Sequence, residues 1–251
     1  MTLFACDLDN TLIYSYKHDI GKDKINVELY QAKEISFITK KTHSLLQEVA
    51  SRILFVPVTT RSIEQYKRIS FPDISLDYAL VCNGGVLLVK GKKDEFWYRE
   101  SLRLIRPSLE ELNKGLSILE SDTARLLDVR FIENLFVFTK SAKPETTLAF
   151  LKKSLDANLV EVFNNGEKVY ILPKGLSKGN AIKRFKNFIK ADTVLAAGDS
   201  EFDVSMFENC DLALVPKDFK WKINSLSTKI EKNDSDLIFS EFILQKGKVY
   251  E

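Results

Sequence analysis

The chain has 251 residues, of which 45% are hydrophobic and 29% charged, and its 37 lysines and arginines nearly balance its 35 aspartates and glutamates. This length and composition indicate one or two globular domains and exclude a disordered chain. A formal net charge of +2 without a basic tract argues against a nucleic-acid partner. Because no apolar run is long enough to span a membrane and no secretory leader precedes Asp7, we expect a cytoplasmic protein without a membrane partner.

Several classes of site are disfavoured by the residues present. The three cysteines, Cys6, Cys82 and Cys210, are widely spaced, so neither a disulfide framework nor a zinc cluster is expected. The two histidines, His18 and His43, are too few for most catalytic triads or multi-histidine zinc sites. Neither a P-loop nor a dinucleotide-binding fingerprint occurs, and no cysteine has the arginine six positions later that a cysteine phosphatase needs.

Apolar runs and helical patterns alternate at the start of the chain. They predict strands at 3–6, 53–58 and 78–82, with helices at 39–49 and 62–69. This βαβαβ order favours a parallel sheet, whose ligands bind beyond the carboxyl ends of the strands. Pro57 lacks a ladder donor in a strand expected to be central, so we expect a local bulge there. The long stretch 14–38 is a candidate hairpin flap over the site.

The pattern changes between residues 86 and 172. It predicts a hairpin from 86–90 and 95–99, a helix at 108–120, strands within 130–139, a helix at 144–155 and a second hairpin over 160–172. These elements suggest an antiparallel sheet with helices on one face. The first pattern returns with a helix from Ser177 to about Ile189 and a strand at 193–197. We therefore predict a Rossmann-like α/β core domain, 1–85 and 173–251, with an inserted α+β domain at 86–172.

Carboxylates follow two of the predicted core strands. Asp7 and Asp9 come directly after 3–6, and residues two apart point to the same side of a strand. Asp199 follows 193–197, Thr59 follows 53–58, and Lys178 lies at the start of the helix before the last strand. Such a gathering of carboxylates requires a positive charge, and Mg²⁺ is the usual hard cation where oxygen ligands meet a phosphate.

These residue types are suited to phosphoryl transfer. A phosphoryl group bridged to Mg²⁺ leaves oxygens for a threonine and a lysine to hold. One carboxylate is then able to attack phosphorus and form an aspartyl-phosphate. A second, two residues away, is able to protonate the leaving group and later to accept a proton from water.

Four segments in order resemble the motifs of the haloacid dehalogenase superfamily of phosphohydrolases: Asp7-Leu8-Asp9-Asn10-Thr11, Thr59, Lys178, and the run from Gly198 to Asp203. The insertion between the second and third motifs resembles a C2-type cap. The stretches 58–62, 83–85 and 176–179 are similar to those of the subgroup with Cof-type sugar phosphatases, sucrose-phosphate phosphatase and mannosyl-3-phosphoglycerate phosphatase. Thr60, Glu201 and Phe202 depart from the common pattern.

The resemblance implies a role for each matching residue. Asp7 is the implied nucleophile and Asp9 the general acid/base, and both are implied Mg²⁺ ligands, Asp9 through its backbone carbonyl. The other implied roles are phosphate binding by Thr59 and Lys178, metal binding by Asp199, support by Asp203, and substrate contacts from Arg61 and Asn83.

The implied activity is Mg²⁺-dependent hydrolysis of a small phosphate ester, with a sugar phosphate as the default substrate. Two alternatives stay open, a phosphomutase with the same chemistry and a non-catalytic binding module on the same scaffold. Ser62 and Gln65 are interpreted differently, as a helix capping box rather than as catalytic groups. The sequence does not indicate an oligomeric state.

Overall fold

The computed structural model describes residues 1–250, and the chain forms two compact units. One unit comprises Met1–Asp94 with Lys178–Glu251, and the other is Glu95–Ser177. The first unit is therefore built from two segments that are separated in the sequence by the whole of the second.

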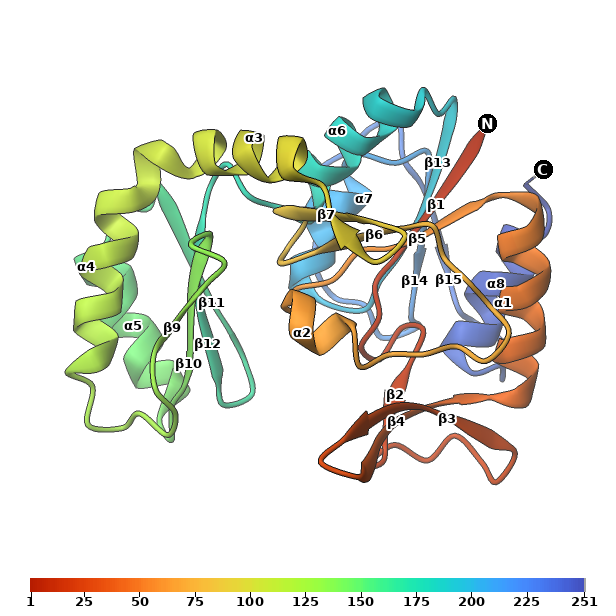
Figure 1. Ribbon diagram of the computed structural model, residues 1–251, viewed down its shortest axis with the longest axis horizontal. Helices are drawn as coiled ribbons and strands as arrows, with labels where there is room; N and C mark the ends of the chain where they lie inside the picture. Colours follow the sequence, from red (N-terminus) through yellow and green to blue (C-terminus); the bar gives the residue numbers. More distant parts are fainter. Residues whose placement is uncertain (251) are drawn as a thin grey trace. The chain divides into compact units, whose positions relative to one another are not determined.

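A five-stranded parallel sheet forms the centre of the first unit, in the order β15-β14-β13-β1-β5. The α/β fold class predicted from the sequence is confirmed. Helices α1 and α8 pack together on one side of the sheet, and α6 and α7 lie together on the other (Figure 1). The bounds are β1 (Thr2–Cys6), α1 (Lys40–Arg52), β5 (Leu54–Pro57), α6 (Lys178–Ile189), β13 (Thr193–Ala197), α7 (Val204–Phe207), β14 (Leu212–Val215), β15 (Lys229–Lys232) and α8 (Phe239–Gly247).

Two small antiparallel sheets complete this unit. The stretch 14–38 forms a hairpin of β3 (Lys24–Tyr30) and β4 (Lys33–Thr39), to which β2 (Tyr14–Ser15) adds a third strand. The other small sheet contains β6 (Tyr78–Val81), β7 (Val86–Val89) and β8 (Lys92–Lys93). The capping box predicted for Ser62 and Gln65 is confirmed at the start of α2 (Ile63–Tyr66).

Pro57 lies in β5 without the expected bulge. The described pairs from Leu54 to Pro57 run in unbroken register with β1. The amide of Thr59 donates to Leu80 on the β6 side, and that pairing begins only at Val58. Since residues 57 and 59 point to the same side of the strand, the missing Pro57 N–H faces a position where no ladder bond is formed. The sheet therefore loses no hydrogen bond at this proline.

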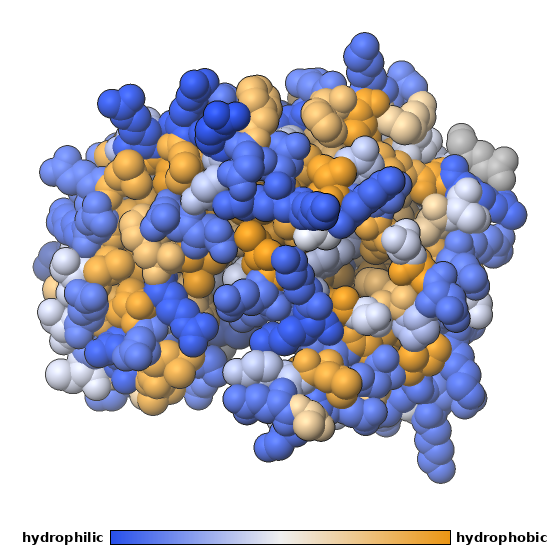
Figure 2. Space-filling model, in the orientation of Figure 1, coloured by the Kyte–Doolittle hydropathy of each residue, from blue (hydrophilic) through white to orange (hydrophobic). Residues whose placement is uncertain are grey.

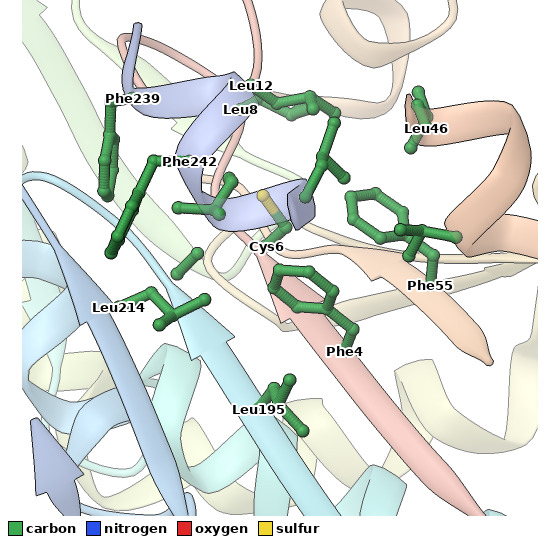
Figure 3. Packing of buried hydrophobic residues seen from close by; sticks show 14 of the residues in the cluster. Phe4, Cys6, Leu8, Leu12, Leu46, Phe55, Leu195, Leu214, Phe239 and Phe242 are labelled. Atoms are coloured by element: carbon green, nitrogen blue, oxygen red, sulfur yellow. The ribbon is translucent and has the colours of Figure 1, made fainter. Parts of the chain in front are cut away.

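The core beneath α1 and α8 is centred on Phe4 (Figure 3). Its ring meets Phe55 edge to face, with centroids 5.2 Å apart. All four residues of the run Leu3–Cys6 are fully buried, as expected for a parallel strand covered on both faces. Helix α8 approaches this strand closely because it carries Gly247, where a Cβ atom would lie 2.7 Å from the Phe4 ring.

The second unit contains a four-stranded antiparallel sheet in the order β11-β12-β10-β9. Helix α4 packs on β10 and β12, and α5 packs on β11 and β12 (Figure 1). The bounds are α3 (Glu95–Ile105), η1 (Arg106–Ser108), α4 (Leu109–Glu120), β9 (Arg130–Ile132), β10 (Phe136–Lys140), α5 (Pro144–Ser154), β11 (Val160–Asn165) and β12 (Lys168–Pro173).

One predicted element of this region is wrong. The sequence analysis placed residues 95–99 in a hairpin strand, whereas they begin helix α3. Trp97, Ser101 and Ile105 are its buried residues, and their spacing of four is helical. This periodicity extends beyond the five residues that were interpreted as a strand. Strand β7 pairs instead with β6 and β8.

The surface mixes residue types, as the balanced composition predicts. The face shown in Figure 2 carries hydrophilic and hydrophobic residues side by side. Among the described residues, every helix is too short or too polar to cross a lipid bilayer.

We expect Phe4→Ala to lower the free energy of unfolding by about 3–5 kcal/mol, because it leaves a cavity at the centre of the core. Urea denaturation followed by circular dichroism measures this change. The control is Phe188→Ala on α6, whose side chain is 55% exposed, with an expected cost of about 1 kcal/mol or less. Equal losses in the two variants would contradict the assignment of Phe4 to the core.

Candidate active site

The candidate site lies at the carboxyl edge of the parallel sheet in the first unit. Cys6, the last residue of β1, is in register with Pro57 on one side and Ala197 on the other. Asp7 continues this pairing through its amide, which donates to the Ala197 carbonyl at 2.9 Å. The residues that follow β1, β5 and β13 therefore meet at one edge, as the sequence analysis predicted.

Lys178 is enclosed between two aspartates. Its Nζ donates to Asp7 Oδ1 and to Asp203 Oδ1, both at 2.6 Å. The three side chains are almost completely buried, with 2%, 9% and 0% exposure for Lys178, Asp7 and Asp203. Buried charges are tolerated only when they are paired in this way. Loss of Lys178 would therefore leave two buried carboxylates without a compensating charge.

Gly179 allows helix α6 to bring Lys178 to this position. A Cβ atom at Gly179 would lie 2.0 Å from the backbone oxygen of Ser205, which no side chain can tolerate. The Gly179 amide also donates to Ser205 Oγ at 3.1 Å. The start of α6 is thus held directly against the start of α7.

Asp203 organises the segment that follows β13. Its Oδ2 accepts hydrogen bonds from the amides of Asp199 and Ser200 and from Ser200 Oγ, at 2.9–3.0 Å. This arrangement caps the short helix η2 (Glu201–Asp203). Gly198 makes room for it, since a Cβ atom there would lie 2.4 Å from Asp203 Cγ. Together with the Lys178 contact, Asp203 therefore accepts four hydrogen bonds within the protein.

Asp199 faces the turn that follows β1. The carbonyl of Leu8 accepts hydrogen bonds from the amides of Thr11, Leu12 and Ile13, so the chain folds back tightly after Asp7. This turn brings Thr11 Oγ1 to 3.1 Å from Asp199 Oδ1, to which it donates. Among the described residues, Asp7, Asp199 and Asp203 form a carboxylate group whose ligand atoms lie within 4.8 Å of one another.

Burial and crowding change the pKa values of this group. Burial, with the neighbouring aspartates, raises the pKa of Asp7 well above its usual value, although Lys178 opposes the shift. Burial and the charge of Asp203 raise the pKa of Asp199 to about 7. Burial alone would lower the pKa of Lys178, but Asp203 and Asp7 outweigh it and the net direction is upward. The pocket therefore contains more negative charge than one lysine balances.

This donor set fits Mg²⁺. It consists of carboxylate oxygens, the ligands that hard divalent cations prefer. A divalent cation beside Asp7 and Asp199 would supply the charge whose shortage the raised pKa values reveal. Since Asp203 is already engaged by four donors, Asp7 and Asp199 are the side chains better disposed to hold it.

Asp9 has a different partner from Asp7. Arg61 Nε and Nη2 donate to its two carboxylate oxygens at 2.9 and 2.7 Å, and the Asp9 side chain is 48% exposed. The carboxylate is therefore outside the group formed by Asp7, Asp199 and Asp203. The sequence analysis gave Arg61 a substrate contact, whereas in the structure its guanidinium is engaged by protein carboxylates.

Thr59 and Asn83 lie together where β5 and β6 end. Thr59 is buried, and its Oγ1 accepts a hydrogen bond from the Arg61 amide at 3.2 Å. The backbone amide of Asn83 donates to the backbone carbonyl of Thr59 at 2.9 Å. Asn83 has a φ of 58° and Cys82 a φ of 54°, a left-handed turn that asparagine accepts more easily than most residues. The turn fixes both residues at the carboxyl edge of the sheet.

The structure adds three residues to which the sequence analysis gave no role: Thr11, Glu28 and Arg68. Thr11 belongs to the first motif, and its contact with Asp199 follows from the tight turn after β1. Glu28 pairs with Arg61 and with Arg68. No spacing in the sequence marks them, because the pairs join residues from separate elements.

The fold and this pocket define a Rossmann-like α/β enzyme with an acidic site, whose carboxylates suit a divalent cation. The sequence model of the haloacid dehalogenase-like hydrolase family matches residues 93–236, which is more than half of the chain. The chain belongs to the haloacid dehalogenase-like hydrolases. The resemblance to phosphatases of this superfamily is confirmed.

Three proteins similar to this chain are named as phosphatases. A phosphoglycolate phosphatase of Sulfurisphaera tokodaii is 25% identical over 235 residues, which cover 89% of this chain and 93% of the relative. A phosphoglycolate phosphatase of Picrophilus torridus is 26% identical over 66% of each chain. The solved sucrose-phosphatase of Synechocystis sp. PCC6803 superposes with a TM-score of 0.67 at 16% identity, over 98% of this chain and 97% of that one. The last similarity supports the fold.

Asp199 should make folding stability depend on pH in EDTA. Its pKa is about 7 in the folded chain and about 3.9 in an unfolded one, so the folded state binds the proton more tightly. The contribution of this carboxyl to stability therefore falls as pH rises from about 4 to about 7. We expect urea denaturation to show this decline and Asp199→Asn to reduce it.

The control is Asp192→Asn, since that side chain is 82% exposed and pairs with the N-terminus. It should keep the slope of the unsubstituted protein above pH 5. The same slope in Asp199→Asn would contradict the raised pKa of Asp199.

Proposed function

We propose that this protein is a Mg²⁺-dependent phosphomonoesterase that acts on a small phosphorylated metabolite through an aspartyl-phosphate on Asp7. The observation that carries the proposal is the buried Lys178–Asp7 pair beside Asp199. It sets a carboxylate nucleophile next to a fixed cation, where phosphoryl oxygens need positive charge. The family assignment supports the same chemistry.

Asp7 performs the first step in this proposal. Its carboxylate attacks phosphorus, a bond forms between Asp7 and phosphorus, and the ester P–O bond breaks. Asp9 gives its proton to the departing alkoxide. Lys178 and Thr59 bind the phosphoryl oxygens during this step.

Asp9 also serves the second step. It accepts a proton from water as the water oxygen attacks the aspartyl-phosphate, which releases inorganic phosphate and restores the Asp7 carboxylate. Mg²⁺, held by Asp7, Asp199 and the backbone carbonyl of Asp9, would neutralise the phosphoryl group and balance the carboxylates. Asp203 keeps Lys178 and the Asp199 segment in place.

The two units are assigned different roles in this proposal. The unit of Met1–Asp94 and Lys178–Glu251 contains all the residues given chemical roles and is the catalytic core. The unit Glu95–Ser177, an antiparallel sheet with helices, is the cap of C2 type that selects the leaving group. Sugar phosphates are the first substrate class to examine. 2-Phosphoglycolate joins them because two relatives carry that substrate in their names.

A phosphate-release screen over a panel of phosphate esters tests the function. The panel contains sugar phosphates, 2-phosphoglycolate and p-nitrophenyl phosphate, each assayed with Mg²⁺ and with EDTA. We expect phosphate release in the presence of Mg²⁺ and none in EDTA. Full activity in EDTA, or no release from any ester, would overturn the proposal.

Asp7→Asn should abolish turnover, because an amide neither attacks phosphorus nor balances the charge of the metal. The measurement is phosphate release from the best ester of the panel. Asp192→Asn, which removes an exposed carboxylate, serves as the control and should retain full activity. Comparable activity in Asp7→Asn and the unsubstituted protein would exclude Asp7 as the nucleophile.

Asp9→Asn should affect the two types of ester differently. Loss of the general acid should slow cleavage of an alkyl phosphate by roughly 10²–10⁴-fold. Nitrophenolate leaves without a proton, so with p-nitrophenyl phosphate Asp7 should still be phosphorylated while the next step lacks its base. Rapid-mix kinetics should show a burst of about one nitrophenolate per enzyme, followed by slow turnover. Equal losses on both esters without a burst would refute the role of Asp9.

A further inference from the structure

Asp9 is one end of a chain of four charged side chains in the first unit. Arg61 joins it to Glu28 of strand β3, and Glu28 in turn pairs with Arg68, which follows α2. These residues come from the turn after β1, the loop between β5 and α2, the hairpin and the segment after α2. The network therefore connects the hairpin to the proposed acid/base by direct contacts.

Arg61 is held by carboxylates on two of its edges. Nε and Nη2 donate to Asp9 at 2.9 and 2.7 Å, while Nη1 and Nη2 donate to Glu28 at 2.9 and 3.0 Å. A second Nη1 hydrogen bond reaches the Gln65 carbonyl at 3.5 Å. A guanidinium has five N–H donors in a rigid plane, and all five are used here. The position of this plane, and with it the position of Asp9, is thus set in part by Glu28.

Glu28 is turned inward by an irregularity in its strand. The β3–β4 register shifts on both sides of Glu28, as in a β-bulge that redirects a side chain. Val27 and Glu28 are consecutive and both are buried, with 2% and 1% exposure, whereas neighbours on a regular strand face opposite sides. The bulge thereby places a carboxylate where the alternation would have placed a solvent-facing side chain.

A buried carboxylate is a costly way to attach a hairpin. Apolar side chains of similar volume usually stabilise such a contact as well or better. Here Glu28 needs Arg61, Arg68 and Ser36, whose Oγ donates to it at 2.6 Å. The Glu28 carboxylate pairs with the Arg61 guanidinium, which also binds Asp9. This shared partner gives Glu28 a role beyond attachment of the hairpin.

We propose that Glu28 is a positioning residue for Asp9, acting through Arg61, an inference that rests on the proposed acid/base role of Asp9. The Asp9 side chain is half-exposed, and both of its carboxylate oxygens accept hydrogen bonds from Arg61, so the guanidinium restrains its rotamer. Proton transfer requires the carboxylate within hydrogen-bond reach of the leaving oxygen. Glu28 supplies that restraint from strand β3.

The test compares Glu28→Gln with Arg68→Gln. Glutamine keeps the size of Glu28 but turns an amide toward Arg61, so the bidentate pair is lost. Arg68→Gln removes a hairpin contact of Glu28 and leaves the Arg61–Asp9 pair intact. Both variants are assayed with the best alkyl phosphate of the panel and with p-nitrophenyl phosphate. Circular dichroism and the thermal midpoint check their folding.

Glu28→Gln should lower kcat for the alkyl phosphate about tenfold or more, as displaced catalytic groups do, with KM nearly unchanged. The first turnover of p-nitrophenyl phosphate should change much less, because nitrophenolate needs no proton. Arg68→Gln should show no such selectivity. In an Arg61→Met background, Glu28→Gln should add no further loss, since the connecting side chain is absent. This non-additivity separates positioning from a general structural role.

Three results would overturn the inference: equal loss on both esters in Glu28→Gln, the same selective loss in Arg68→Gln, or additive losses with Arg61→Met. If Glu28→Gln does not fold, Arg61→Lys replaces it, because lysine keeps the charge and loses the bidentate geometry. The same selectivity is then expected, and its absence overturns the inference. Asp9→Asn separates failure of the proposed function from failure of the inference. If Asp9→Asn loses no more activity on the alkyl phosphate than on p-nitrophenyl phosphate, the acid/base role of Asp9 and the inference fail together. If only Asp9→Asn shows this selective loss, the positioning role of Glu28 alone is refuted.

Discussion

The buried ion pairs of Lys178 are the constraint on which the rest of the first unit depends. One ammonium group, 2% exposed, joins Asp7 at the end of β1 to Asp203 in the segment after β13. The pairs require α6 to begin at Lys178, and Gly179 permits the close contact with Ser205 that this needs. Because loss of Lys178 would leave two buried carboxylates unpaired, this one side chain ties β1, α6 and the segment after β13 to one another.

The two aspartates that follow β1 pair with different cationic side chains. Asp7 turns into the buried pocket and pairs with Lys178, whereas Asp9 remains half-exposed and pairs with Arg61. The two carboxylates therefore do not share one environment, although only Leu8 lies between them. In the proposed mechanism this division suits a nucleophile that must stay ionised beside a cation and a proton carrier that must reach water.

Much of this arrangement was predictable because it follows from topology. Parallel strands bring their carboxyl ends to one edge, so Asp7, Thr59 and Asp199 were expected to meet once the strands were recognised. Glu28 was not predictable, because a β-bulge breaks the alternation that assigns strand residues to a face. The segment 95–99 was misjudged for a related reason: five residues are compatible with a strand, and only Ser101 and Ile105 further along reveal the helical repeat.

The division of the first unit into two segments has a consequence for its biosynthesis. Strand β1 and its neighbour β5 leave the ribosome early, whereas β13 follows only after Glu95–Ser177 has been made. Until then one edge of the apolar strand β1 is unpaired, a state that invites association with other chains. The growing polypeptide is thus most vulnerable during translation of the second unit, when its need for a chaperone is greatest.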